Sequence, residues 1–127
     1  MSNSKRLLFV DDEDSIRATL PLILQEHGFD VKSAASVAEA LQKIQTHSFD
    51  IVLSDLNIHK PQDGFDVVRA MRKVNPRSVA IILTGYPAVE NAVEALRLRI
   101  DDYFVKPADV NSLVATMNEK LAERKQA

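Results

Sequence analysis

The chain has 127 residues, of which 46% are hydrophobic and 27% are charged, with a net charge of −2 and no cysteine. This length suits one domain with a sizeable core, and the small net charge provides no basic surface for nucleic acid or for an anionic membrane. The lack of cysteine excludes disulfides, thiolate zinc sites and thiol nucleophiles. The first five residues are polar, and no apolar run approaches the roughly 20 residues that span a bilayer, so we expect a cytoplasmic protein.

Five short apolar segments alternate along the chain with five segments of helical periodicity. Strands are expected at about residues 6–10, 30–34, 50–54, 78–83 and 102–105. The first, third and fourth are almost continuously apolar, which is typical of strands that are buried on both faces. The second and fifth are more polar and therefore suit the edges of a sheet.

Start and stop signals mark most of the helices between these strands. Gly28 is placed to end the first helix, and Ser36 with Glu39 forms a capping box for the second. The third helix is expected to begin near Gly64, and Asp109 can cap the fifth. The side chains expected to face the core from these four helices are Ile16, Leu20, Ile23, Leu24, Val37, Leu41, Ile44, Phe65, Val68, Met71, Leu113, Val114, Met117 and Leu121.

The fourth helix is expected to begin near Pro87, because proline suits the first turn of a helix. Helical periodicity then turns Val89, Val93 and Leu96 toward the core. The same periodicity leaves Leu98 on the opposite, exposed face of the helix.

The strict alternation of strands and helices indicates a doubly wound α/β fold, in which helices cover both faces of a five-stranded parallel sheet. With strands two and five at the edges, the expected strand order is 2-1-3-4-5. The winding direction then reverses between strands one and three. Ligands bind at such a reversal, beside the carboxyl ends of the strands.

Charged residues follow three of these strands directly. The first strand runs into Asp11 and Asp12, the third into Asp55, and the fifth into Lys106. Crowded carboxylates raise the cost of ionising one another, so we expect a compensating cation. Mg²⁺ suits carboxylate ligands beside a phosphoryl group, and the lysine would neutralise further charge on that group. Asp55 is then the candidate nucleophile.

These residues form part of a more specific pattern. Its elements are the acidic pair Asp11-Asp12, the acceptor Asp55, Thr84 at the end of the fourth strand, Tyr103, and Lys106-Pro107. With them the chain resembles the receiver domain of two-component response regulators, which has a flavodoxin-like fold, over about residues 5–123. The resemblance implies a Mg²⁺ site in which Asp12 and Asp55 bind directly, Asp11 through water, and Asn57 through its backbone carbonyl.

The resemblance also implies roles for the remaining residues. Thr84 and Lys106 would bind the phosphoryl oxygens, Tyr103 would rotate as a switch residue, and the Lys106-Pro107 peptide would be cis. Plainer alternatives stay open, since Thr84 could pair with local backbone and Tyr103 could simply pack at the edge of the sheet.

The chain departs from the family pattern at three places, one of which is Ala108, where Phe commonly follows the Lys-Pro. Residues 58–64, which follow the acceptor, form a loop one residue longer than usual, and Arg99-Ile100 replaces a common Gly-Ala before the fifth strand. His59 lies in this loop. Neither it nor His27 or His47 is expected to bind a metal.

The expected function is that of a signalling module and not of an enzyme with turnover. Asp55 would take a phosphoryl group from a sensor histidine kinase or a phosphotransfer protein, in a Mg²⁺-dependent reaction that the domain itself promotes. Phosphorylation would then shift a two-state equilibrium that a partner reads. The alternative is a phosphohydrolase of the haloacid-dehalogenase kind, but Asn57 stands where that chemistry needs a second Asp.

We expect residues 1–127 to form a single receiver domain, without a membrane segment and without direct binding to nucleic acid. We expect the fourth helix, the fifth strand and the fifth helix to form a surface for self-association as a homodimer or for a target, with Leu98 near its centre. The sequence leaves open whether the domain is free-standing or part of a longer protein, and it identifies neither the kinase nor the output.

Overall fold

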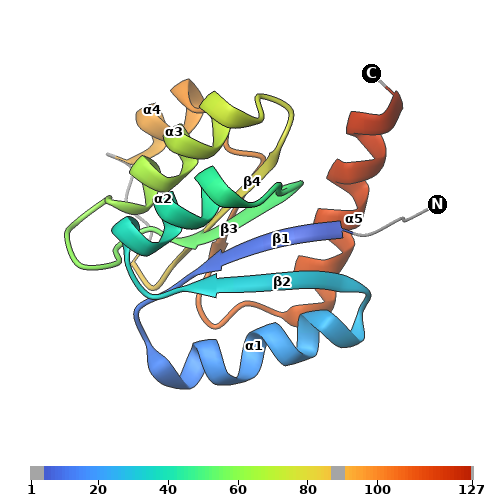
Figure 1. Ribbon diagram of the computed structural model, residues 1–127, viewed down its shortest axis with the longest axis horizontal. Coiled ribbons are helices and arrows are strands. Elements are labelled where there is room, and N and C mark those ends of the chain that lie inside the picture. Colours follow the sequence, from blue (N-terminus) through green and yellow to red (C-terminus); the bar gives the residue numbers. More distant parts are fainter. Residues whose placement is uncertain (1–4, 87–90, 127) are drawn as a thin grey trace.

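The computed structural model describes residues 5–86 and 91–126. Its centre is a sheet of five strands: β1 (Lys5–Val10), β2 (Phe29–Ala34), β3 (Ile51–Asp55), β4 (Val79–Thr84) and β5 (Asp102–Val105). The strand order is β2-β1-β3-β4-β5, and the four pairings are parallel. The predicted fold class and strand order are therefore confirmed (Figure 1).

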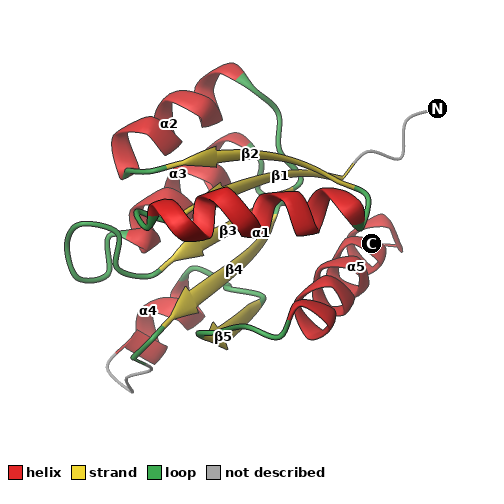
Figure 2. Cartoon of the chain, turned by 90° about the horizontal axis from the view of Figure 1, so that it is seen from below, coloured by secondary structure: helices red, strands yellow, loops and turns green. Residues whose placement is uncertain are grey.

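Helices cover both faces of this sheet. They are α1 (Asp14–Glu26), α2 (Val37–Thr46), α3 (Gly64–Val74), α4 (Ala92–Arg97) and α5 (Val110–Gln126). One face carries α1 and α5, and the other carries α2, α3 and α4 (Figures 1 and 2). Within the described ranges, no helix is both long and apolar enough to cross a membrane.

Successive strand residues alternate between two hydrophobic cores. Leu8 and Val10 of β1 belong to the core under α2 and α3, whereas Leu7 and Phe9 belong to the core under α1 and α5. The residues of β3 and β4 are buried in the same alternating way, which explains why these strands are apolar up to the polar residues at their carboxyl ends. Each such aliphatic or aromatic side chain stabilises the fold by about 1.5–3 kcal/mol through its burial.

The predicted helix ends are formed by the residues that the sequence indicated. Ser36 Oγ accepts the N–H of Glu39 at 3.1 Å, and the Glu39 carboxylate accepts the N–H of Ala35 at 2.6 Å. Gly28 follows α1 with φ +93°, a conformation that favours glycine. Asp109 accepts a backbone N–H from the first turn of α5 at 3.0 Å.

The orientation of α4 differs from the prediction. Val93 and Leu96, which were expected in the core, are exposed, whereas Leu98 packs against the core under α2 and α3. The described helix ends at Arg97, and Arg99 then adopts φ +56°, so the chain turns and carries Leu98 inward. The prediction that Leu98 is exposed was therefore wrong.

Three other expectations concern the buried face of α1 and the beginning of the fourth helix. Ile23 of α1 is exposed, so the buried face of this helix is narrower than predicted and is centred on Leu24. The expected start of the fourth helix at Pro87 and the inward position of Val89 lie outside the described residues, and both stay predictions.

Candidate functional site

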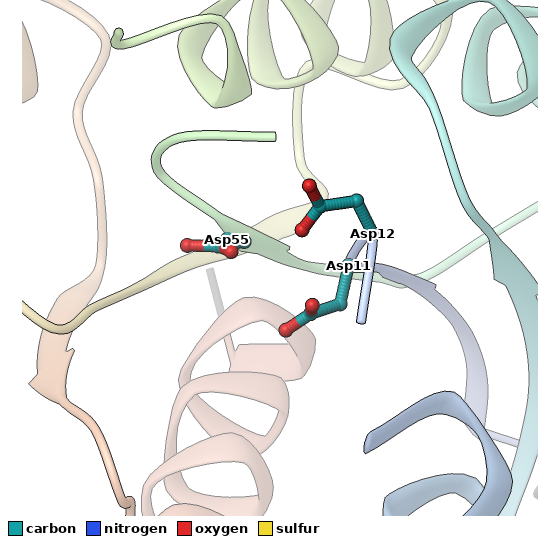
Figure 3. Close-up of side chains that lie close together, drawn as sticks. All are labelled: Asp11, Asp12 and Asp55. Atoms are coloured by element: carbon teal, nitrogen blue, oxygen red, sulfur yellow. The ribbon is translucent and has the colours of Figure 1, made fainter. Parts of the chain in front are cut away.

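Three carboxylates meet at the carboxyl ends of β1 and β3. In the sheet register Val10 lies opposite Ser54, so the residues that follow them, Asp11 and Asp55, emerge side by side. Asp12 comes next, and one carboxylate oxygen from each of the three acids lies within 4.8 Å of the others (Figure 3). The fold therefore brings together the acids that the sequence places at two separate strand ends.

Lys106, which follows β5, reaches the same place. Its Nζ donates hydrogen bonds to Asp11 Oδ2 at 2.9 Å and to Asp55 Oδ2 at 3.0 Å, and it lies 3.7 Å from Glu13 Oε1. The Lys106-Pro107 peptide is cis, as the resemblance implied. One ammonium group thus spans two acids from different strands.

Burial distinguishes the three acids from one another. Asp11 and Asp55 are buried, whereas Asp12 is exposed. Asp11 Oδ1 accepts the N–H of Glu13 at 2.9 Å, and its Oδ2 is bound by Lys106. These contacts are needed because a buried carboxylate without partners is costly.

Burial and ion pairing act in opposite directions on the pKa values of this site. Burial raises the pKa of Asp55 above its ordinary value, and the hydrogen bond from Lys106 offsets only part of that effect. Burial alone would lower the pKa of Lys106, but its hydrogen bonds to Asp11 and Asp55 raise that pKa above its ordinary value. The lysine therefore stays charged opposite the acids at physiological pH.

The other expected site residues lie around this centre. Thr84 is buried at the end of β4, and its hydroxyl accepts the N–H of Tyr86 at 3.1 Å, which is the local pairing that the sequence left open. Tyr103 of β5 packs against the core, and no described residue bonds its buried hydroxyl. The N–H of Asn57 donates to Asp55 Oδ1 at a long 3.4 Å.

The residue that shapes the loop between β3 and α3 was not predicted from the sequence. The Asp63 carboxylate accepts three backbone N–H groups, from Ile58 at 2.7 Å, His59 at 3.1 Å and Lys60 at 3.0 Å. An Asp immediately before a glycine that begins a helix was the available signal, since Asp side chains often bind nearby backbone in turns. The loop is therefore an ordered part of the site's rim.

Comparison with known families identifies the chain. The family model of the response regulator receiver domain matches residues 7–118. The chain belongs to this family. The transcriptional regulatory protein ZraR of Escherichia coli strain K12 is 36% identical to this receiver domain over 116 residues, which make up 91% of this chain and 26% of ZraR. The receiver domain thus spans about a quarter of the length of that relative.

Solved receiver domains share the same architecture. A CheY-like response regulator receiver domain protein from Methanospirillum hungatei JF-1 has a TM-score of 0.90 and 32% identity, with 98% of both chains covered. The beryllofluoride-activated NtrC4 receiver domain dimer has a TM-score of 0.82 and 32% identity, covering 94% of this chain and 98% of that chain. Both similarities extend over nearly the whole receiver domain.

The acids of this receiver domain fit a divalent cation. They offer three carboxylate oxygens within 4.8 Å of one another, and Asp12 is exposed to solvent. Mg²⁺ prefers oxygen ligands and is usually held by one or two carboxylates together with waters. The donor set of the site therefore suits Mg²⁺.

Proposed function

We propose that this receiver domain accepts a phosphoryl group on Asp55 from the phosphohistidine of a sensor histidine kinase or a phosphotransfer protein. The observation that carries the proposal is the position of Lys106, whose Nζ lies 3.0 Å from Asp55 Oδ2 within the acidic cluster. Asp11 is a poorer nucleophile, because it is fully buried and both of its oxygens accept hydrogen bonds. The only bond to Asp55 Oδ1 among the described residues is the long one from Asn57.

The transfer exchanges one bond for another. An Asp55 oxygen bonds to phosphorus while the bond from phosphorus to the histidine nitrogen breaks, and the released imidazole keeps the electron pair and binds a proton. Lys106, already beside Asp55, would bind one phosphoryl oxygen, and the Thr84 hydroxyl would bind another. Catalysis here rests mainly on positioning and on charge neutralisation.

Mg²⁺ is the cation that we propose for this site. Asp12 and Asp55 would bind it directly, Asp11 through water, and Asn57 through its backbone carbonyl. When bound, Mg²⁺ neutralises charge on the phosphoryl group. The family membership of the chain and the close approach of the three acids support this assignment.

The domain would promote its own phosphorylation and the hydrolysis of its acyl phosphate, without turnover of a separate substrate. The hydrolase alternative has no support, because the matching family is a receiver family. At the position where a hydrolase needs its second acid, Asn57 accepts the N–H of Gln62 at 2.7 Å through its side-chain oxygen. An amide cannot transfer protons as that acid must.

We place the output surface on α4, β5 and α5. Binding of Thr84 to the phosphoryl group would shift Tyr103 and, with it, α4. The exposed apolar side chains of this surface are Val93, Leu96 and Val105. They replace Leu98 as the proposed centre of a homodimer, and the similar NtrC4 receiver domain is a dimer in its beryllofluoride-activated form.

The remaining parts of the proposal concern organisation. We propose that residues 1–127 form a single receiver domain that acts in the cytoplasm through protein contacts. Similar proteins such as ZraR are transcriptional regulators. The net charge of −2 gives no support for direct binding of nucleic acid by residues 1–127 themselves.

Transfer from a small phosphodonor tests the proposed function. Acetyl phosphate with Mg²⁺ should add one phosphoryl group to the protein, detected by intact mass, and chelation of Mg²⁺ should prevent the addition. The Asp55→Asn variant should remain unmodified. Asp102→Asn, which changes an exposed acid of β5, should react like the wild type. Equal modification of Asp55→Asn and the wild type would refute the assignment.

A further inference from the structure

His59 lies at the rim of the acidic site. Its Nδ1 is 3.9 Å from Asp12 Oδ2, and its side chain is 60% exposed. The other two histidines are occupied locally: His27 Nδ1 contacts the Ile23 carbonyl oxygen, and His47 Nδ1 contacts the hydroxyl of Thr46, both at 2.9 Å. His59 is thus the histidine whose ring faces the cluster of acids.

The loop holds the backbone of His59 in this position. Its N–H and that of Lys60 both donate to Asp63 Oδ2, at 3.1 and 3.0 Å. Across the loop, the side-chain oxygen of Asn57 accepts the N–H of Gln62 at 2.7 Å. Because the backbone is fixed on both sides, only side-chain rotation is needed to bring the imidazole closer to Asp12.

The distance between the two side chains is compatible with a shared metal ion. Nitrogen and oxygen ligands each lie about 2.1 Å from a transition-metal ion, so two ligands of one ion are at most about 4.2 Å apart. The separation of 3.9 Å between His59 Nδ1 and Asp12 Oδ2 falls within this limit. Coordination through Nδ1 would leave the ring proton on Nε2.

We propose that His59 is a metal-selectivity residue that supplies a nitrogen ligand beside Asp12. With this ligand, the acidic site binds divalent ions that prefer imidazole, such as Ni²⁺, more tightly than carboxylates alone would. Imidazole suits Ni²⁺ and Zn²⁺, whereas Mg²⁺ prefers oxygen. The inference rests on the proposed function, because it takes the cluster of Asp11, Asp12 and Asp55 to be a cation site. It revises the expectation that none of the histidines binds a metal.

Titration calorimetry of tag-free protein with Ni²⁺ and, separately, with Mg²⁺ tests the inference. We expect His59→Ala to weaken Ni²⁺ binding at least tenfold and to change Mg²⁺ binding less than twofold. His47→Ala, which removes an exposed histidine on the far end of α2, should change neither affinity. Asp12→Ala should weaken the binding of both ions.

The outcomes separate this inference from the proposed function. Suppose that Mg²⁺ binds the wild type as expected, but that His59→Ala leaves the Ni²⁺ affinity unchanged or weakens the binding of both ions equally. In either case His59 is not a selectivity residue, and the phosphoacceptor site stands. If His47→Ala causes the same loss of Ni²⁺ affinity, the nitrogen ligand lies elsewhere, and the inference is again overturned. Failure of Mg²⁺ to bind the wild type, or to respond to Asp12→Ala, would refute the cation site itself.

Discussion

Gly64 begins α3 against the strand that carries the proposed acceptor. A Cβ at this position would lie 2.1 Å from the Asp55 carbonyl oxygen and 2.9 Å from that of Leu56, so the backbone would have to move. We expect Gly64→Ala to lower the free energy of unfolding by about 3 kcal/mol, measured by urea denaturation. Gly85→Ala, whose Cβ would meet nothing within 4 Å, should change it by less than about 0.5 kcal/mol. Equal effects of the two variants would contradict this explanation.

Asp55 should limit stability at neutral pH because burial raises its pKa above the ordinary value of 3.8. A carboxyl whose pKa is raised on folding stabilises the folded state below its unfolded pKa, and that contribution is lost as the pH rises through the folded pKa. Asparagine is neutral at every pH, so a variant with asparagine at this position does not lose stability in this way as the pH rises. We therefore expect the Asp55→Asn variant to gain stability relative to the wild type as the pH is raised from below 3.8 to 7. A difference that is independent of pH in urea denaturation would contradict the raised pKa.

Single residues could be predicted from the sequence where strand position alone determines their neighbours. Asp11, Asp55 and Lys106 were placed together because parallel strands end at one edge of the sheet. The role of Asp63 could not be predicted in the same way, since its partners are backbone N–H groups of an irregular loop. The approach of His59 to Asp12 depends on the same loop and was missed for the same reason.

The helix α4 packs against the core through the residue that follows it. Leu98 contacts the core under α2 and α3, whereas Leu96 is 79% exposed. We expect Leu98→Ala to lower the free energy of unfolding by about 1–2 kcal/mol, less than for a fully buried leucine. Leu96→Ala should change it by less than about 0.5 kcal/mol. Thermal or urea denaturation of both variants would test this orientation, and a larger loss for Leu96→Ala would show that the helix is turned the other way.

A partly buried ion network holds the turn between α4 and β5. Asp101 lies 3.2 Å from Arg72 of α3 and 2.7 Å from Arg124 of α5, and it also accepts the N–H of Ala80 at 2.8 Å. Removing the carboxylate leaves two arginines without this partner, so we expect Asp101→Ala to cost about 3 kcal/mol in urea denaturation. The matched variant Asp102→Ala changes an exposed neighbour and should cost far less. Similar losses would show that the network adds little stability.

The buried face of a helix or strand could be predicted where the periodicity of its own sequence determines it, as in β3, β4, α3 and α5. The end of α4 is decided by contacts from elsewhere in the chain: Arg72 donates to the carbonyl oxygens of Leu98 and Arg99, both at 3.1 Å. A helical projection that continues through Leu98 cannot include this contact or the left-handed turn at Arg99. For this reason the exposed and buried leucines of this segment were interchanged.

The order of the strands in the sheet could be predicted from how polar each strand is. β3 and β4 are buried at every residue, whereas β2 and β5 have exposed positions and form the two edges of the sheet. Once the two edge strands are assigned, right-handed crossovers predict the strand order that the structure shows. The winding reversal next to β1 then brings Asp11, Asp12 and Asp55 together at one edge of the sheet.

The central claim is that Asp55 is the residue phosphorylated in a Mg²⁺-dependent reaction. The most direct measurement is to treat the acetyl phosphate-reacted protein with borohydride, which reduces an aspartyl phosphate to homoserine, and to map the peptides by mass spectrometry. We predict homoserine at position 55 alone, and none when Mg²⁺ has been chelated. Homoserine at Asp11 or Asp12, with Asp55 unchanged, would contradict the claim.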